Sequence, residues 1–270
     1  MPRLHEKTVV VCGGEGSALK DVAILLRRLG YRVFPAEGSG AVLERLTKQA
    51  VDLVLLDSRL PAADVIATLK AMRQSTAWEA IPVLTVAADY SKTGNDEYIR
   101  FGSAGLLEMP SRAEALSRLI EQCIAPPGRP VRTAPRVPYS GLVKLSWDGG
   151  SEIYRAVNLS TRGIYLRSAE PLPVTTRVEL EFVLDGDETL RFGGEVIYQM
   201  GSYNDVFRVD PGMAIAFDQL DDEPRQLLED WVEEVLCGDL DSMRSRNLLR
   251  ISHPAKGREQ GAGTLPPEKG

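Results

Sequence analysis

The 270-residue sequence has few of the side chains that build cross-links and metal sites. Its three cysteines, Cys12, Cys123 and Cys237, are far apart, and its two histidines, His5 and His253, lie near opposite ends. This pattern argues against a disulfide framework, a cysteine-rich zinc site and a histidine-based triad. Because no acid–base pair or nucleophile–base set is visible either, we expect neither an enzyme nor a metal protein. The sparse cysteines also favour a reducing, cytoplasmic compartment.

Long apolar runs are missing as well. No run approaches the roughly 20 residues needed to cross a bilayer. Residues 1–7 lack the apolar core of a secretion signal, so we expect no membrane insertion. A content of 43% hydrophobic and 26% charged residues is that of a globular protein, which argues against a mostly disordered chain or a coiled coil. At roughly 100–200 residues per domain, the length suggests one large domain or two ordinary ones.

The net charge of −6 is unevenly distributed along the chain. Residues 1–125 carry fifteen acidic and fifteen basic side chains, whereas residues 126–237 carry nineteen acidic and eleven basic ones. An acidic protein binds the nucleic acid backbone poorly, so we expect no DNA binding. Within the acidic segment, however, Arg129, Arg132 and Arg136 stand close together with no acid among them. Such a local cationic cluster indicates a site for an anion.

The first half of the chain alternates short apolar runs with helical patterns. Strands are predicted at 8–12, 32–34, 52–56, 81–86 and 105–108, and helices at 17–29, 40–49, 63–74, 92–101 and 111–124. Five strands alternating with five helices indicate an α/β domain, a doubly wound five-stranded parallel sheet covered on both faces. The continuous apolar runs fit strands that are buried on both sides. We assign this domain to residues 1–124.

The second half has a different pattern. Residues 125–138 hold five prolines and form a semi-stiff, extended linker. Alternating apolar and polar residues then predict strands at 141–147, 152–158, 164–168, 176–184, 190–199 and 206–217, followed by a helix at 221–236. Residues 139–237 therefore read as a small antiparallel β-barrel with a C-terminal helix. Residues 238–270 are rich in glycine, proline and charge, and we expect a disordered tail.

Polar groups in the first domain gather where its strands end, the functional edge of such sheets. The stretch 51–61 (VDLVLLDSRLP), with Gly30-Tyr31 and Met109-Pro110, resembles a response regulator receiver domain over residues 6–124. The resemblance implies a flavodoxin-like fold and places Asp57 where the family has its phosphoacceptor.

The sequence departs from the receiver pattern around Asp57. Gly13 and Gly14 stand where the family has two carboxylates, Ala87 replaces its hydroxyl, and Met109 replaces its lysine. A hard divalent cation needs several oxygen ligands, so charge neutralisation of a phosphoryl group would be poor here. We interpret the domain as phosphorylation-deficient and retained for binding a protein partner or a second copy of the chain. A phosphorylation-gated response regulator that uses Asp57 is the alternative.

Two short motifs in the second half suit a phosphate-bearing ligand. Arg132 and Arg136 lie on the linker, and Asn158, Ser160 and Gly163 follow at the end of the second predicted strand, which strand register can bring beside the linker. Arginine binds phosphate in bidentate fashion and stacks on flat bases. Asn158 can read a base edge, Ser160 can donate to a phosphate or hold a turn, and Gly163 permits close approach or a positive φ.

This pair of motifs, RxxxR followed by NxSxxG, resembles the PilZ domain over residues 128–236. The family binds the bacterial messenger cyclic di-GMP. The resemblance implies that Arg132 and Arg136 grip the phosphates and stack on guanine, while Asn158, Ser160 and Gly163 complete the pocket. The chain then reads as a cyclic di-GMP effector in which ligand binding orders the arm between the domains. Alternatively, the arginines are solvated linker charges, residues 158–163 are a simple turn, and the protein is a scaffold that binds only protein.

Overall fold

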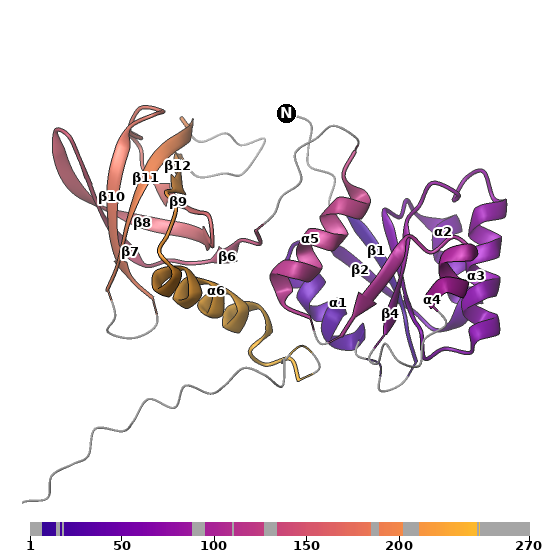
Figure 1. The fold of residues 1–270 in the computed structure, drawn as a ribbon. Coiled ribbons are helices and arrows are strands. Elements are labelled where there is room, and N and C mark those ends of the chain that lie inside the picture. The colour runs from indigo at the N-terminus through magenta and orange to yellow at the C-terminus, as the bar shows by residue number, and fades with distance from the viewer. Residues whose placement is uncertain are drawn as a thin grey trace, which may run out of the picture.

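Two domains with different architectures lie side by side in the computed structural model of the chain (Figure 1). The structure describes residues 7–14, 17, 19–87, 95–109, 111–126, 134–184, 189–201, 211–241 and 243. The expected disordered tail therefore lies almost entirely outside the described residues, as do Arg129 and Arg132. Among the described helices, none combines the length and apolar composition that a membrane crossing requires.

The N-terminal domain is built on a five-stranded sheet with the order β2-β1-β3-β4-β5. Its strands are β1 (Thr8–Cys12), β2 (Arg32–Ala36), β3 (Leu53–Asp57), β4 (Val83–Ala87) and β5 (Gly105–Glu108). All neighbouring strands are parallel. Every residue of β1, β3 and β4 is buried, as expected for the inner strands of a sheet covered on both faces. The predicted doubly wound, flavodoxin-like sheet is thus confirmed.

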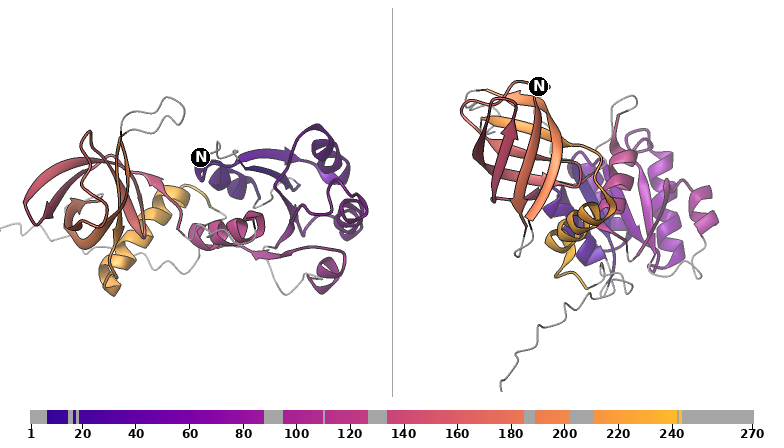
Figure 2. Two further views of the ribbon diagram at one scale, coloured as in Figure 1. Left: turned by 90° about the horizontal axis from the view of Figure 1, so that it is seen from above. Right: turned by 60° about the vertical axis from the view of Figure 1, so that its left-hand side comes forward.

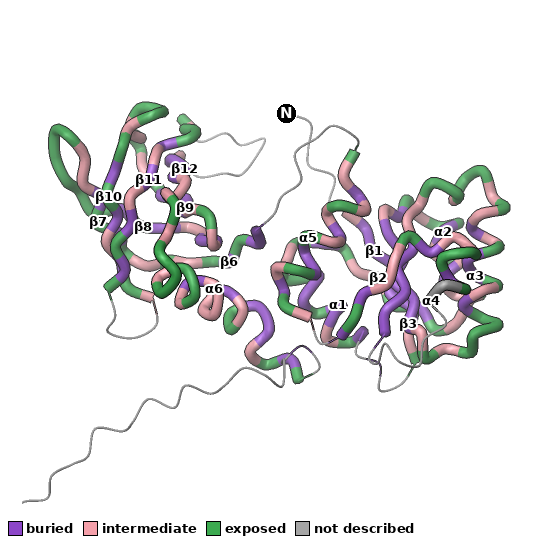
Figure 3. Tube along the Cα trace, viewed as in Figure 1, coloured by how far each residue is buried: buried purple, intermediate pink, exposed green. Residues whose placement is uncertain are grey.

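Five helices cover the two faces of this sheet. They are α1 (Leu19–Arg28), α2 (Gly38–Lys48), α3 (Ala62–Gln74), α4 (Asn95–Arg100) and α5 (Ala113–Ile124). The apolar residues of α1 and α5 form one core with one face of the sheet, whereas those of α2, α3 and α4 form a second core with the other. Figure 3 shows the buried strands between exposed helix surfaces. The α1–α5 face is the one turned toward the second domain (Figures 1 and 2).

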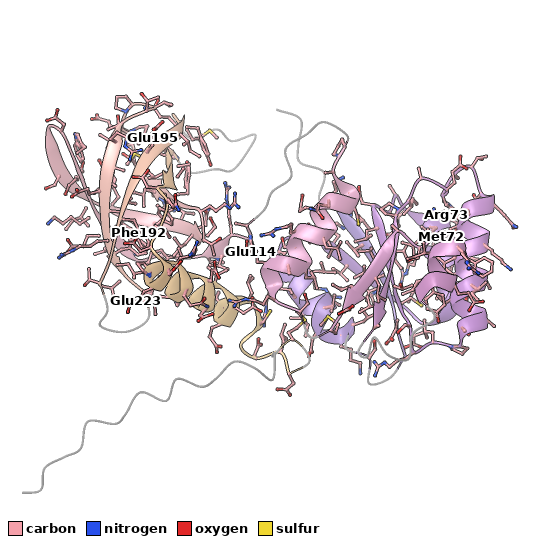
Figure 4. All side chains as sticks on the ribbon, viewed as in Figure 1. Met72, Arg73, Glu114, Phe192, Glu195 and Glu223 are labelled. Carbon is pink, nitrogen blue, oxygen red and sulfur yellow. The ribbon has the colours of Figure 1, made fainter. Side chains whose placement is uncertain are left out.

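The C-terminal domain is a closed antiparallel barrel. Its strands are β7 (Leu142–Trp147), β8 (Gly150–Ser160), β9 (Gly163–Arg167), β10 (Arg177–Val183), β11 (Thr189–Met200) and β12 (Gly212–Phe217). The sheet runs in the order β8-β7-β10-β11-β12-β9, and pairing of β8 with β9 closes it. Three aromatic rings pack together inside, those of Phe182, Phe192 and Phe217; Phe192 is labelled in Figure 4. The predicted barrel is confirmed.

The strand β6 (Val137–Pro138) and the helix α6 (Asp222–Cys237) add features that the sequence did not predict. The two residues of β6 lie within the stretch predicted as a linker and pair with β8. Proline is tolerated there because β6 is an edge strand. The closing helix α6 buries Leu228 and Val232 against the barrel side of the core and also contacts α1 and α5.

Candidate functional site

The corner at the end of β8 is a tight hairpin turn. Ser160 lies opposite Gly163 in the β8–β9 register. The Ser160 hydroxyl donates to the Gly163 carbonyl at 3.1 Å and accepts from the Arg162 amide at 3.3 Å. With only 6% of its surface exposed, Ser160 holds the turn in the shape described here. This is the second of the two roles that the sequence allowed for the residue.

Gly163 is required by the packing of the barrel. A Cβ atom at this position would lie 2.3 Å from the carbonyl oxygen of Ile215, in the backbone of β12. Gly163 is not one of the glycines with positive φ, so a left-handed backbone is not the reason for it. The sequence suggested either close backbone approach or a positive φ as the reason for Gly163, and the structure shows close approach. The missing Cβ atom lets β9 pair tightly with β12.

The arm that precedes the barrel is attached beside this corner. Val137 pairs with Leu159, and Pro138 pairs with Asn158. The Tyr139 amide then donates to the Val157 carbonyl at 3.2 Å. Arg136, which comes directly before β6, is exposed next to the end of β8 that forms the turn. The structure thus brings Arg136 and residues 158–163 together, whereas Arg132 lies outside the described residues.

Asn158 faces outward on the barrel surface. It pairs with Tyr165 of β9, directly after a register irregularity between Ala156 and Asn158. Because residues opposite each other in a sheet share a face, Asn158, Pro138 and Tyr165 lie on the same side. The neighbouring Leu159 points inward and is fully buried. Asn158 is partly exposed on this outer face, whereas only 5% of the Tyr165 surface is exposed.

Two arginines and two tyrosines on the same outer face were not assigned to the site from sequence. Arg155 lies directly opposite Arg167, and both are exposed. Tyr165 stacks on Tyr198 with ring centroids 6.1 Å apart, and 36% of the Tyr198 surface is exposed. Like charges facing each other across two strands are unfavourable by themselves. The signal in the sequence is the alternation along β8 and β9, which puts Arg155, Tyr165 and Arg167 on the face of Asn158.

Asp57 lies at the C-terminal end of β3, where the receiver pattern placed it, and only 4% of its surface is exposed. Arg59, two residues further on, closes over its carboxylate. The Arg59 amide donates to Oδ1 at 2.9 Å, and its guanidinium donates to Oδ2 at 3.1 Å from Nη2 and to both oxygens at 3.3 Å from Nε. The hydroxyl of Ser17 also donates to Oδ2. Sequence reasoning missed Arg59, although its position two residues after Asp57 was visible.

These contacts fix the charge of Asp57. Burial by itself raises the pKa of its carboxyl group, but hydrogen bonds from the Arg59 guanidinium, the Ser17 hydroxyl and the Arg59 amide outweigh it. The net effect lowers the pKa of Asp57 below its usual value. The carboxylate is therefore ionised at neutral pH, and its charge is already balanced by a guanidinium.

The described residues around Asp57 do not fit the divalent cation that receiver domains use. Gly13 and Gly14 follow β1 and offer no side-chain oxygen. Ala87 and Met109, both buried, stand at the ends of β4 and β5 and offer neither a hydroxyl nor an ammonium group. Within the described part of the chain, no group of three potential metal-ligating side chains occurs. The carboxylate of Asp57 itself is already paired with Arg59.

Comparison with known proteins separates the two halves of the chain. Residues 9–121 match the family described as the response regulator receiver domain, and residues 130–234 match the PilZ domain. The Escherichia coli K12 transcriptional regulatory protein ZraR is 36% identical over 101 residues, which are 37% of this chain and 22% of that protein. The Pseudomonas aeruginosa transcriptional activator protein PfeR is 30% identical over 106 residues, 37% of this chain and 34% of that protein. The chain therefore spans only a fifth to a third of these relatives.

Solved structures align with the N-terminal half. The chemotaxis response regulator CheY4 of Vibrio cholerae has 22% identity and a TM-score of 0.39, and the alignment covers 43% of this chain and 98% of CheY4. The receiver domain of the Pseudomonas aeruginosa histidine kinase PA1611 has 21% identity and a TM-score of 0.41, with 44% and 98% covered.

Receiver and PilZ domains are regulatory rather than catalytic, and PilZ domains bind cyclic di-GMP as a ligand. The motifs, the parallel sheet with Asp57 at a strand end and the closed barrel all agree with the two family matches. The chain therefore contains a response regulator receiver domain at residues 9–121, followed by a PilZ domain at residues 130–234.

Proposed function

We propose that the protein is a cyclic di-GMP effector in which the arm before the barrel closes over the ligand. The observation that carries this proposal is the pairing of Pro138 with Asn158, which sets Arg136 beside the corner at residues 158–163. In this arrangement the guanidinium groups of Arg132 and Arg136 bind the phosphates and stack on guanine, and Asn158 reads a base edge. Ser160 and Gly163 shape the corner against which the ligand lies.

The charge distribution supports the binding of an anion on this face. The segment 126–237 has eight more acidic than basic residues, yet Arg136 directly before β6, Arg155 of β8 and Arg167 of β9 lie on the strands around Asn158. A charge-assisted hydrogen bond contributes about 1.5–3 kcal/mol, and a micromolar ligand needs about 8 kcal/mol in total. A few such hydrogen bonds, together with stacking of a guanine base on an arginine, reach that value after the entropy cost of ordering the arm is subtracted.

Ligand binding repositions the receiver domain in this proposal. Arg132 and Arg136 lie on the segment that joins the two domains, so ordering that arm restricts the hinge between them. Phosphorylation is not required, because Arg59 already occupies the Asp57 carboxylate and the usual cation ligands are replaced by Gly13 and Gly14. The receiver domain then acts as a surface for a protein partner or a second copy of the chain.

Calorimetric titration with cyclic di-GMP tests ligand binding. We expect Arg136→Ala to weaken binding at least tenfold, because it removes charge-assisted contacts worth about 1.5–3 kcal/mol. Arg191→Ala is a matched control, since Arg191 is an exposed arginine of β11 whose partner is Glu181 at 3.3 Å. If the unaltered protein takes up no cyclic di-GMP, the scaffold interpretation is correct instead. Equal affinities of the two variants would reject the arm as the binding element.

Labelling with a small phosphodonor in the presence of magnesium tests the loss of phosphorylation. We expect no stable label on the full-length protein, because the described residues around Asp57 offer no cation site and the Asp57 carboxylate is already paired with Arg59. Stoichiometric labelling that disappears in Asp57→Asn would instead make the protein a phosphorylation-gated response regulator.

A further inference from the structure

The closing helix of the barrel is shared by both domains. On its barrel side, the Trp231 ring meets the Tyr139 ring edge-on, with centroids 5.6 Å apart. Tyr139 is only three residues beyond Arg136, and its hydroxyl donates to the Val183 carbonyl at 2.5 Å. It thus connects the end of the ligand arm to α6. Figure 1 shows α6 lying between the barrel and the helices α1 and α5.

At the receiver side, α6 reaches the first turn of α5. The two carboxylate oxygens of Glu233 accept hydrogen bonds from the Ala113 amide at 2.9 and 3.1 Å. One turn earlier, Asp230 pairs with Arg112 at 3.0 Å. Both acids project from the same side of the helix, because residues three apart are neighbours on a helical surface. Two side chains of the barrel domain thus bind the N-terminus of α5.

This contact replaces a missing cap. The residue preceding α5 is Arg112, and no side-chain hydrogen bond from its own position caps the helix. The first amides of a helix lack partners within it and normally take one from a nearby side chain. For Ala113 that partner is Glu233, 120 residues away in the other domain. A carboxylate is also favoured there by the helix dipole.

The C-terminal end of α6 is fastened to α1. The guanidinium of Arg28 donates to the Leu236 carbonyl at 2.6 Å and to both oxygens of Asp239 at 2.6 and 2.7 Å. Leu236, Leu240 and Met243 are buried, and they belong to the same apolar cluster as the residues of α1 and α5. The α1–α5 face of the receiver domain is therefore a docking surface, and α6 is its occupant.

We propose that α6 is the element through which the barrel holds and releases the receiver domain, with Glu233 as the cap that is made or broken. Movement of the arm at Arg136 reaches Tyr139, then Trp231, and shifts α6 relative to α5. The docking half of this inference stands without a ligand. The release half rests on the proposed function, because it needs cyclic di-GMP to move the arm.

Hydrogen exchange of the full-length protein, measured on peptides that cover the first turn of α5, tests the docking half. We expect Glu233→Ala to speed exchange of this turn about tenfold, because a helix cap is lost. Glu234→Ala is the matched control, because Glu234 is the neighbouring acid and is exposed. This substitution changes the charge and the helix propensity of α6 by the same amount as Glu233→Ala. The same exchange in both variants and in the unaltered protein would overturn the docking role of Glu233.

Addition of cyclic di-GMP to the same measurement tests release. We expect the first turn of α5 to exchange several-fold faster in the ligand-bound protein, and we expect this response to be lost in Tyr139→Leu while calorimetric binding persists. Trp231→Phe is a milder second variant that should reduce the response. If the protein binds the ligand but the exchange of α5 is unchanged or slower, release through α6 is wrong and the proposed binding function stands. If no ligand binds, the proposed function fails, and Glu233→Ala still decides the docking half.

Discussion

Single residues set the chemistry that is available at each candidate site. Asp57 has the position of a phosphoacceptor, but its buried carboxylate accepts hydrogen bonds from the half-exposed Arg59 and from Ser17. The position could be read from the sequence because it follows a buried apolar strand. The network could not, because Ser17 reaches Asp57 only after β1 and β3 have paired in the sheet.

The lowered pKa of Asp57 predicts a pH dependence of stability. A carboxyl group whose pKa is lower in the folded state stabilises the protein above its unfolded pKa, about 3.9, and this contribution disappears as the pH falls through the folded value. Asp57→Asn should therefore cost about 1–3 kcal/mol at pH 7, the loss of charge-assisted hydrogen bonds. The difference from the unaltered protein should shrink below about pH 4.

Urea unfolding followed at pH 7 and at successively lower pH measures this difference. The effect belongs to the receiver domain, so a probe in that domain, such as the fluorescence of Trp78, is suitable. A gap between the two proteins that stays constant across this pH range would show that Arg59 does not hold the Asp57 carboxylate in its ionised form.

At the scale of elements, the barrel is closed by a close approach of two strands. Gly163 of β9 and Gly212 of β12 each leave no room for a Cβ atom, which would lie 2.3 Å from Ile215 O and 2.1 Å from Leu166 O, respectively. The sequence presented Gly163 only as part of a motif. Its structural reason appears in the pairing of β9 with β12, where Gly163 lies opposite Ala216.

Gly163→Ala should destabilise the barrel by about 1–3 kcal/mol, the usual cost of forcing extra volume into a packed site. Gly201→Ala is the control, because a Cβ atom at Gly201 would meet nothing within 4 Å. The midpoint of chemical denaturation distinguishes the two variants. Equal stability of both would mean that Gly163 serves the ligand rather than the strand packing.

The strand β6 and the helix α6 illustrate how far periodicity extends. The apolar stripe of Leu227, Leu228, Trp231, Val232 and Val235 predicts that α6 closes the barrel. In the structure Leu228 and Val232 are buried, Leu227 and Trp231 are half-buried, and Val235 is exposed. Nothing in that stripe indicated that Asp230 and Glu233 would reach α5 of the other domain. Likewise, proline content suggested a linker up to residue 138, but Val137 is fully buried opposite Leu159. Two residues are too few for any alternation to be recognised.

At the scale of the whole molecule, the two domains share one continuous apolar cluster. It runs from the α1–α5 side of the receiver domain through α6 into the barrel interior. The charged contacts of Arg28 and Arg112 with Asp239 and Asp230 are exposed or half-exposed, and such ion pairs contribute little by themselves. Burial of the apolar residues at the end of α6 therefore contributes most of the docking energy. The ion pairs favour one orientation of α6 on the receiver domain.

The two architectures and their order are visible in the amino-acid sequence, because apolar periodicity changes from helix-and-strand alternation to period two at the proline-rich stretch. The sequence also identifies the candidates for the ligand corner and for the phosphoacceptor, since motifs are local. Three further features appear only in the folded chain: Arg59 balances Asp57, Arg155 and Arg167 share the face of Asn158, and Glu233 caps α5. The shared face of Arg155, Arg167 and Asn158 depends on strand register, and the cap by Glu233 depends on domain docking. Patterns in a single sequence encode neither.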